Sequence, residues 1–502
     1  SFKEGNHFMT NNIMIIIAFA LYLGLMMYIG VYYYRKSNSI GDYILGGRQL
    51  GPWITALSAE ASDMSGWMLM GVPGLAYTTG ISGMWIAIGL TLGTWANWNF
   101  VSRRLRNHTE VAKDSLTLPD FLKNRFHDES HSVAVISALF ILIFFLIYTS
   151  SGFVAGGKLF NTILGVDYTT SLFITAGIVV FYTFLGGFLA VSWTDCIQGT
   201  LMFFAILAVP VTATFVLGGP VDTMALIYQE FPESLNIWGP ETNTFTLVIS
   251  IISSLSWGLG YFGQPHILVR FMAISDAKEL KKSTNIAMTW VTISLTAAIF
   301  VGLIGHVYLL PDQLEGVQSE TVFLVMTERL FTPFVAGLIW SAVLAAIMST
   351  ASSQLLVTAS AISKDFYHNL IHKNASDKEL VLVSRITVLL VALIAIYLAL
   401  DPNNYILTMV AYAWAGFGAA FGPAILFSLF WRRMTRHGCI AGIVVGGLTV
   451  LIWKQFAFFG LYEIIPGFLL SSIAIYVVSI MDNLPPRPVL KDYRDAQRKH
   501  TV

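Results

Sequence analysis

Residues 58–67, SAEASDMSGW, place two carboxylates, Glu60 and Asp63, inside an apolar block long enough to cross a membrane. Ionisable side chains are costly at membrane depth, and those that occur there are functional by default. The adjoining Ser65 and Gly66 weaken a helix. The stretch therefore indicates an interrupted transmembrane helix with a functional Asp63. The alternative is a structural carboxylate that accepts backbone hydrogen bonds at the break.

The composition is typical of a polytopic helical membrane protein. Of the 502 residues 55% are hydrophobic and 12% charged, about half the ~25% of a soluble domain. Apolar blocks of about 20 residues recur, the length that crosses a ~30 Å hydrocarbon layer. They predict an all-α fold with thirteen transmembrane helices. These spans lie near 12–34, 52–77, 81–101, 133–157, 166–186, 195–217, 246–269, 285–309, 331–362, 380–400, 405–431, 439–458 and 463–481.

The loops between the spans argue against an enzyme and against a nucleic-acid partner. None is long enough for a soluble catalytic domain, and no nucleophile–base or metal constellation is present. Basic and acidic residues both number 29. All but four of the basic residues, Arg270 included, fall in alternate loops, and the positive-inside rule then predicts an outside N-terminus and a cytoplasmic C-terminus. The four exceptions are Lys3, Lys158, Arg329 and Lys454.

Two spans are interrupted by small residues and proline. The second holds the opening stretch, and the seventh holds WGLGYFGQPH at 257–266. They are the first members of two five-span sets, spans 2–6 and 7–11, of opposite topology. Such paired interruptions in inverted halves point to the binding site of a secondary transporter. One transport domain, 1–502, is predicted, divided into 12–51, 52–217, 218–244, 245–431, 432–481 and a solvated tail, 482–502.

The ninth span supplies hydroxyl groups that could complete an ion site. Ala346, Ser349 and Thr350 share one helix face by their spacing of three and four residues. Together with carbonyls freed at the break near Asp63, they would form an oxygen shell for a hard monovalent cation. The alternative is that both hydroxyls bond back to their own helix or hold two helices together.

Aromatic residues near both breaks suggest a pocket for a compact solute. Trp257 and Tyr261 lie one turn apart before Pro265, and Trp67 and Tyr148 could close a box. Ordinary packing is the alternative. Because no Arg or Lys is expected at mid-membrane, a zwitterionic or neutral solute is favoured. Arg48 could contact an inner gate or lipid headgroups. Asp195 could be functional, or it could simply be stabilised by a nearby helix N-terminus.

These stretches resemble the sodium/solute symporter family, and within it the branch that transports proline. The resemblance runs through almost the whole chain, and its motifs are highly specific for the family. They read DYILGGRQLGP, ALSAEASDMSGW, FLGGFLAVSWTD, WGLGYFGQPHILVRF, LAAIMSTASSQLL, YAWAGFGAAFGP and WKQFAFFGLYEIIPGF.

The resemblance implies a LeuT-type fold with two inverted five-helix repeats, and sodium-driven import of L-proline across a bacterial inner membrane. It implies no organic cofactor, and we expect a functional monomer in the lipid bilayer. The implied sodium ligands are Ala61, Met64, Ala346, Ser349 and Thr350, with Asp63 near the ion. The implied substrate residues are Ser65, Gly66, Trp67, Tyr148, Trp257, Tyr261 and Pro265. Positions linked to coupling or gating are Arg48, Asp195 and Glu320.

Glu60 departs from the resemblance, because the proline branch carries glycine in its place. It could be a partnered structural residue, a proton site or a charge that tunes the ion site. The alternative functions are symport of another small amino acid or neutral solute and, on the same scaffold, a solute sensor. A sensor would need an output domain, and the 21 residues from 482 to 502 are too few for one.

Overall fold

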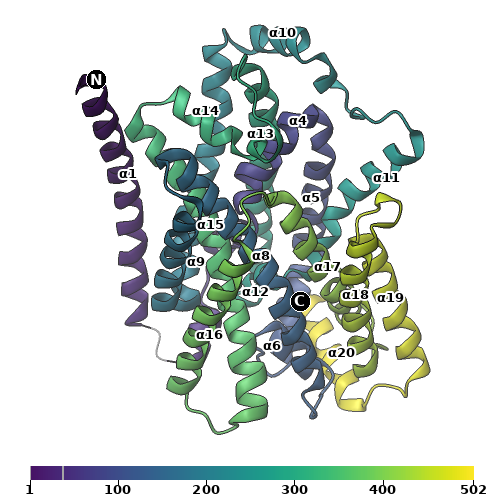
Figure 1. The fold of residues 1–502 in the computed structure, drawn as a ribbon. Coiled ribbons are helices and arrows are strands. Elements are labelled where there is room, and N and C mark those ends of the chain that lie inside the picture. Colours follow the sequence, from purple (N-terminus) through teal and green to yellow (C-terminus); the bar gives the residue numbers. More distant parts are fainter. Residues whose placement is uncertain (1, 37–38, 502) are drawn as a thin grey trace.

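The computed structural model describes residues 2–36 and 39–501, and this part of the chain is helical without any strand (Figure 1). An isolated parallel bridge pairs Leu50 with Ile274. The helices that form the main body are α1 Phe2–Tyr34, α3 Pro52–Asp63, α4 Val72–Thr79, α5 Met84–Ala96, α8 Ser132–Leu164, α9 Tyr168–Val216, α11 Thr244–Leu255, α12 Pro265–Ala273, α13 Leu280–Tyr308, α15 Pro333–Ser360, α16 Asp377–Leu398, α17 Ile406–Phe430, α18 Arg436–Phe456 and α19 Ile464–Met481.

Shorter helices connect or extend these elements. They are α2 Ile40–Leu45, α6 Ser102–Val111, α7 Leu118–Arg125, α10 Pro220–Glu230, α14 Val322–Leu330 and α20 Arg487–Thr501. Short 3-10 and π segments are η1 Gly46–Arg48, η2 Trp67–Gly71, η3 Gly80–Gly83, η4 Asn97–Val101, η5 Pro232–Leu235, η6 Ser256–Gly263, η7 Ala277–Glu279, η8 Gly316–Thr321, η9 Ala361–Ile371 and η10 Phe458–Gly460.

In the described part of the chain, eleven helical stretches are long and apolar enough to cross a membrane, and Tyr168–Phe184 is a shorter apolar helix. Two differences separate this count from the thirteen predicted spans. The second half of the expected span near 52–77 joins the span near 81–101 through the turn at Gly80 into one helical stretch, Trp67–Val111. Within α9, Gly187 has φ +64°, a conformation that glycine adopts without strain. This kink separates the two predicted spans that α9 contains.

Both predicted interruptions are present. Helix α3 ends at Asp63, and Met64 has extended backbone with ψ 99° before η2 begins at Trp67. Helix α11 gives way to the 3-10 segment η6, which ends at an extended Gln264 before α12 starts on Pro265. Non-helical backbone at membrane depth is tolerated where protein or a cavity surrounds it. Most of both breaks is buried in protein.

Glycine lets α5 approach the second break closely. A Cβ atom built on Gly93 would lie 2.4 Å from the Cα of Gly258, and one on Gly89 would lie 2.4 Å from the Leu255 carbonyl oxygen. Atoms cannot pack at such distances, so these sites need glycine. The close approach brings the backbone of η6 against α5 and fixes where the aromatic side chains of η6 point.

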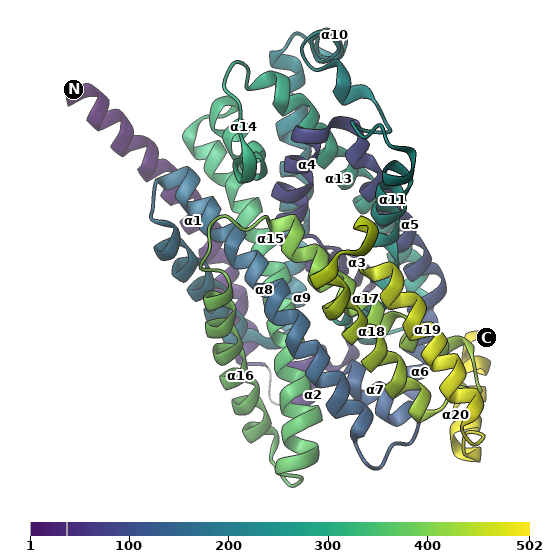
Figure 2. The same cartoon turned by 45° about the vertical axis from the view of Figure 1, so that its right-hand side comes forward.

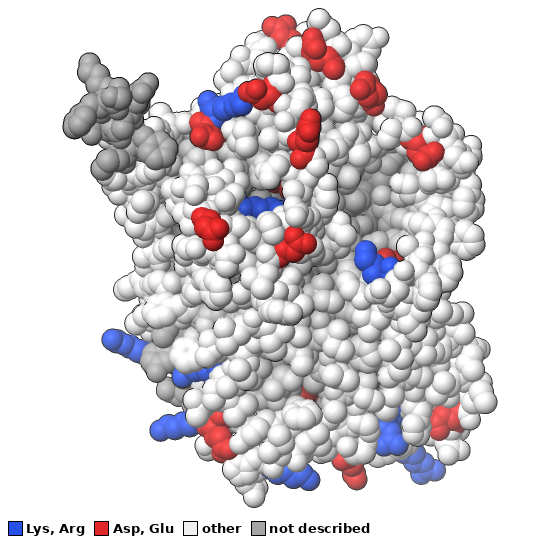
Figure 3. Space-filling view, viewed as in Figure 1, with Lys and Arg blue, Asp and Glu red and all other residues white. Residues whose placement is uncertain are grey.

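Charged side chains gather at the two ends of the molecule. In the space-filling view, Lys and Arg collect at the lower end of the visible face, and acidic side chains collect at the upper end near α10 (Figure 3). Several charged side chains lie at mid-height, and the zone just below the middle of this face is largely uncharged (Figure 3). Figure 2 shows α18 and α19 side by side on the edge opposite α1, with α20 at their lower end. This pattern is the one expected of a chain that crosses a bilayer.

The segment 482–501 is largely exposed to solvent, as expected, but most of it is a helix packed on the protein. Residues 487–501 form helix α20, which packs against α6. Val489 and Ala496 are the buried residues of this helix. Gln497 accepts a hydrogen bond from Arg104 at 2.7 Å and donates to the Leu429 carbonyl at 3.1 Å. The helix is amphipathic, and a charged composition alone does not reveal the partner that its apolar side covers.

Candidate functional site

The break after α3 lies directly opposite the hydroxyl groups of α15. Ser349 donates to the carbonyl oxygen of Ala61 at 2.7 Å, and Thr350 donates to the same oxygen at 3.2 Å. Ser349 also lies 3.1 Å from the carbonyl of Ala346. Carbonyl and hydroxyl oxygens are the donors that hard cations prefer. The structure thus brings together the predicted ligand positions of the two helices, Met64 being the first residue past α3.

The residues between α3 and η2 are held by the first half of the chain. Trp67 donates its indole N–H to the Asp63 carbonyl at 2.9 Å, and the Tyr148 hydroxyl lies 3.5 Å from the same oxygen. A Cβ atom on Gly66 would lie 2.6 Å from the Cβ of Ala155, so only glycine fits there. Ser65 is buried, and its hydroxyl oxygen accepts a long bond of 3.4 Å from the Trp67 backbone N–H.

Both carboxylates of the opening stretch are buried and bonded to aromatic side chains. Asp63 is fully buried and accepts from the Tyr261 hydroxyl at 2.6 Å. Glu60 is 2% exposed and accepts from the Trp98 indole N–H at 3.0 Å. Each carboxylate keeps one oxygen without a hydrogen-bond partner. Glu60 is therefore half-partnered, whereas a purely structural role predicts full pairing.

Aromatic rings from both halves of the chain surround the two breaks. Trp67 and Trp257 lie 6.5 Å apart by ring centroids, and Trp414 meets Tyr261 edge-on at 4.9 Å. The Trp414 indole N–H donates to the Trp257 carbonyl at 2.7 Å. We call Trp67, Tyr148, Trp257, Tyr261 and Trp414 the aromatic box. The structure brings the four predicted aromatic residues together and adds Trp414 from α17, which sequence reasoning missed.

A further ring reaches the aromatic box from outside the two predicted repeats. Tyr462, in the connection before α19, stacks on Trp257 with centroids 5.6 Å apart and planes 14° apart. Its backbone N–H donates to the Ser253 hydroxyl at 3.0 Å, and its own hydroxyl donates to the Ala411 carbonyl. Nothing in the sequence around Tyr462 distinguishes it from an aromatic residue at a membrane interface.

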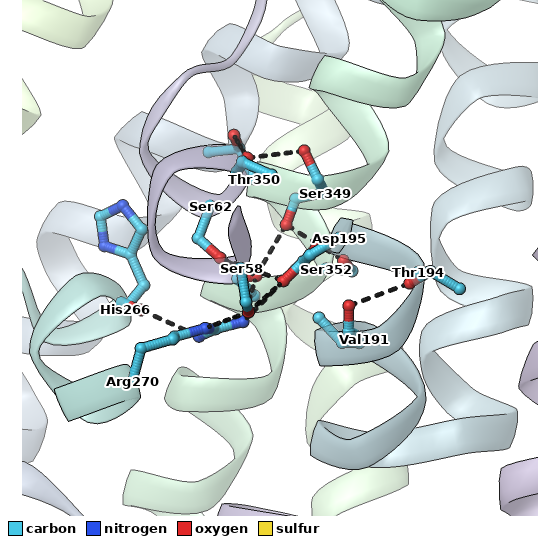
Figure 4. A network of polar contacts seen from close by, with 12 residues as sticks. Ser58, Ser62, Val191, Thr194, Asp195, His266, Arg270, Ser349, Thr350 and Ser352 are labelled. Atoms are coloured by element: carbon cyan, nitrogen blue, oxygen red, sulfur yellow. Dashed lines mark hydrogen bonds and ion pairs between the residues drawn. The ribbon is translucent and has the colours of Figure 1, made fainter. Parts of the chain in front are cut away.

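Two basic side chains next to the ends of predicted spans are buried inside the protein and paired with carboxylates. Arg270, predicted to lie in an inner loop, is fully buried and forms a salt bridge with Asp195 at 3.2 Å (Figure 4). Its Nε donates to the Ser58 hydroxyl at 3.0 Å, and another nitrogen donates to Ser353 at 2.8 Å. The sequence signal was Asp195 itself, because a buried carboxylate needs a cationic partner.

This network leads back to the candidate ion site. The Ser58 and Ser62 hydroxyls donate to Asp195 at 2.7 and 3.3 Å. The Ser62 and Ser353 hydroxyls lie 2.9 Å apart, and Ser353 donates to the Ser349 carbonyl at 2.7 Å. Asp195 therefore helps to join α9, α3, α12 and α15 and has a structural role at the least.

The second buried cation is Lys158, which pairs with Glu320. The Lys158 ammonium lies 3.1 Å from Glu320 and donates to the Asn404 carbonyl at 2.7 Å. Glu320 also accepts from the backbone N–H groups of Ile406 and Leu407 at the start of α17, at 2.8 and 3.1 Å. The Lys158–Glu320 pair joins α8 to η8 and α17. It is separate from the hydrogen-bond network around Asp195.

Arg48 lies in η1, before α3, and its side chain contacts other parts of the protein. Its guanidinium forms a salt bridge with Asp114 at 2.6 Å, donates to the Ser115 carbonyl at 2.8 Å and donates to the Met272 carbonyl. Burial lowers the pKa of Arg48, which Asp114 partly offsets. Of the two interpretations left open for Arg48, these contacts favour an inner closure over lipid headgroups.

Comparison with known proteins gives consistent results. A sequence model described as the sodium:solute symporter family matches residues 43–446. A high-affinity proline transporter of Bacillus subtilis is 50% identical over 94% of this chain and 99% of its own length. A sodium/proline symporter of Escherichia coli is 49% identical over 96% of both chains.

Two solved structures have the same fold. A substrate-bound, outward-open sodium-coupled sialic acid symporter has a TM-score of 0.79 at 20% identity and covers 94% of this chain and 99% of its own. Mhp1, a nucleobase-cation-symport-1 family transporter in a closed conformation, has a TM-score of 0.51 at 16% identity and covers 90% and 98%. At these identities the likeness concerns the fold alone.

Removing both charges of the Arg270–Asp195 pair should cost less stability than the sum of removing each charge alone. Arg270→Met leaves Asp195 buried and uncompensated, at a cost of about 3–5 kcal/mol. Arg270→Met combined with Asp195→Asn should lose less than the two single variants together, because neither charge then remains unpaired. The apparent melting temperature of the purified protein in detergent measures both effects. Strictly additive losses would show that the two side chains act independently.

Proposed function

Because the chain belongs to the sodium:solute symporter family, we propose that it imports L-proline together with sodium by alternating access. The observation that carries the proposal is the pair of α15 hydroxyls aimed at the Ala61 carbonyl beside the break in α3. The names of the Bacillus and Escherichia relatives support proline as the solute. The chain is then a transporter and carries out no enzymatic step.

In this proposal the chain crosses a bacterial inner membrane thirteen times. The kinks at Gly80 and Gly187 divide long helical stretches into separate crossings. Spans 2–6 and 7–11 are the inverted repeats of a LeuT-type fold, with α18 and α19 peripheral. The basic lower end in Figure 3 supports a cytoplasmic C-terminus. The protein works as a monomer.

Sodium binds between the Ala61 and Met64 carbonyls and the oxygens of Ala346, Ser349 and Thr350. When it binds, the two hydroxyls turn their protons away from Ala61 and offer lone pairs to the ion. The ion then joins the first repeat to the second and holds the break open to solute. Asp63 lies near this ion and accepts a hydrogen bond from the Tyr261 hydroxyl through Oδ2.

Proline occupies the aromatic box next to Ser65, Gly66 and Pro265. Its ring is small and apolar, which suits packing against tryptophan and tyrosine. The box offers no unpaired cation, so the proline carboxylate would rely on backbone N–H groups at the start of η2. Arg48 and Asp114 close the inner side, and Lys158 and Glu320 close the outer side.

Uptake of labelled proline into proteoliposomes tests this function. We expect accumulation with an inward sodium gradient and none when potassium replaces sodium. Uptake of equal size without sodium would refute the coupling. Accumulation of another small amino acid without proline uptake would retain the mechanism and change the solute. Binding of proline without any accumulation would favour a sensor.

Ser349→Ala with Thr350→Ala should weaken sodium binding much more than it weakens expression. Each hydrogen bond to a charged group contributes roughly 1.5–3 kcal/mol, so losing two ligands should raise the half-saturating sodium concentration more than about tenfold. Thr358→Ala, which removes a hydroxyl bonded only within α15, is the matched control. An unchanged sodium dependence in the double variant would exclude α15 from the ion site.

Tyr462→Ala should raise the KM for proline about threefold to tenfold, because stacked aromatic pairs contribute about 0.5–1.5 kcal/mol. Tyr462→Phe keeps the ring on Trp257 and should lie close to wild type. Tyr476→Ala, which unstacks a ring of α19 from Trp431, controls for general loss of aromatic packing. If Tyr462→Ala changed only the maximal rate, Tyr462 would not form a wall of the pocket.

A further inference from the structure

Two buried carboxylates lie one helical turn apart on α3, and each has one oxygen free. Glu60 and Asp63 are three positions apart and so share one side of the helix. They are 2% and 0% exposed. Oε2 of Glu60 and Oδ1 of Asp63 have no hydrogen-bond partner, and the two groups interact electrostatically.

No positive charge in the described part of the chain compensates this pair. Among the described residues, no salt bridge joins Glu60 or Asp63 to Lys, Arg or His. Their partners, Trp98 and Tyr261, are neutral donors. The other two acids of the candidate site differ, because Asp195 pairs with Arg270 and Glu320 pairs with Lys158. Two adjacent anions buried without a cation are strongly unfavourable.

We propose that Glu60 and Asp63 bind a second monovalent cation of the sodium class through Glu60 Oε2 and Asp63 Oδ1. Hard cations take carboxylate oxygens as ligands, and one positive charge between the two groups offsets their repulsion. The site differs from the one at Ala61, which consists of neutral carbonyl and hydroxyl oxygens. The inference deepens, and rests on, the sodium-coupled transport proposed above.

The neighbours of this second site connect it to the solute pocket. Trp98 of η4 holds Glu60, and Tyr261 of η6 holds Asp63. Tyr261 also belongs to the aromatic box and packs edge-on against Trp414. A cation between the carboxylates therefore fixes α3 relative to both η4 and η6, and its binding orders one wall of the pocket before proline arrives.

The number of sodium ions bound per chain tests the inference. We expect equilibrium binding of radioactive sodium to the purified, proline-free protein to give two ions per chain. Glu60→Gln, which keeps an acceptor for Trp98 and removes the charge, should give one. Glu463→Gln is the matched control, since Glu463 is also buried with one unpartnered oxygen but lies before α19. It should still give two.

A second variant tests the inference even if Glu60→Gln does not fold. Trp98→Phe keeps both carboxylates and removes only the indole donor, so it should bind two ions with a severalfold weaker second affinity. One ion bound by the wild-type protein, or two bound by folded Glu60→Gln, would overturn the inference. If the two carboxylates hold a proton in place of sodium, the wild-type protein binds one sodium ion. This result would also overturn the inference.

The sodium count and the proline assay fail independently. Binding is measured without solute, so two ions on a chain that does not accumulate proline would refute the proposed substrate and keep the second site. One ion on a chain that accumulates proline with sodium would refute the second site and keep the proposed substrate. In proteoliposomes, we expect a sodium-to-proline flux ratio of two for the wild-type chain and one for Glu60→Gln.

Discussion

The contact between the α15 hydroxyls and the Ala61 carbonyl is the interaction on which the rest of the site depends. Ser349 and Thr350 can reach this oxygen because α3 stops three residues before η2 starts. A continuous helix would use its own carbonyls internally. The interruption frees backbone groups, and it is tolerated because protein surrounds it. The candidate ion site, the carboxylates and the aromatic box all lie around this one discontinuity.

Buried charge is the second constraint on the architecture. Arg270 with Asp195 and Lys158 with Glu320 are buried ion pairs, each of which joins helices distant in sequence. Because an unpaired charge is so costly in a low dielectric, each pair restricts how its helices can move. Glu60 with Asp63 lacks such a partner, and a mobile cation would let the same acidic pair respond to what is bound.

Part of the site could be predicted from residues 58–67 and 257–266 alone. Gly66 and Gly258 weaken a helix, and Pro265 lacks the N–H that a helix interior needs, so local chemistry indicates the breaks. The face of α15 that carries Ser349 and Thr350 follows from helical spacing. Trp414, Tyr462 and Arg270 could not be found this way, because each acts through a contact with a residue more than 70 positions away.

The sequence by itself determined the class of protein, the two breaks, and the side chains that carry oxygen and aromatic rings to them. These depend on composition and on short-range periodicity, which a chain has before it folds. Tertiary structure decided which oxygen faces which hydroxyl, which buried charges are paired, and that α20 packs against α6. Those outcomes depend on how helices pack across the bundle, and Glu60 shows the consequence. Its charge is plain in the sequence, and only the packing of α3 against η4 and η6 leaves that charge without a cation.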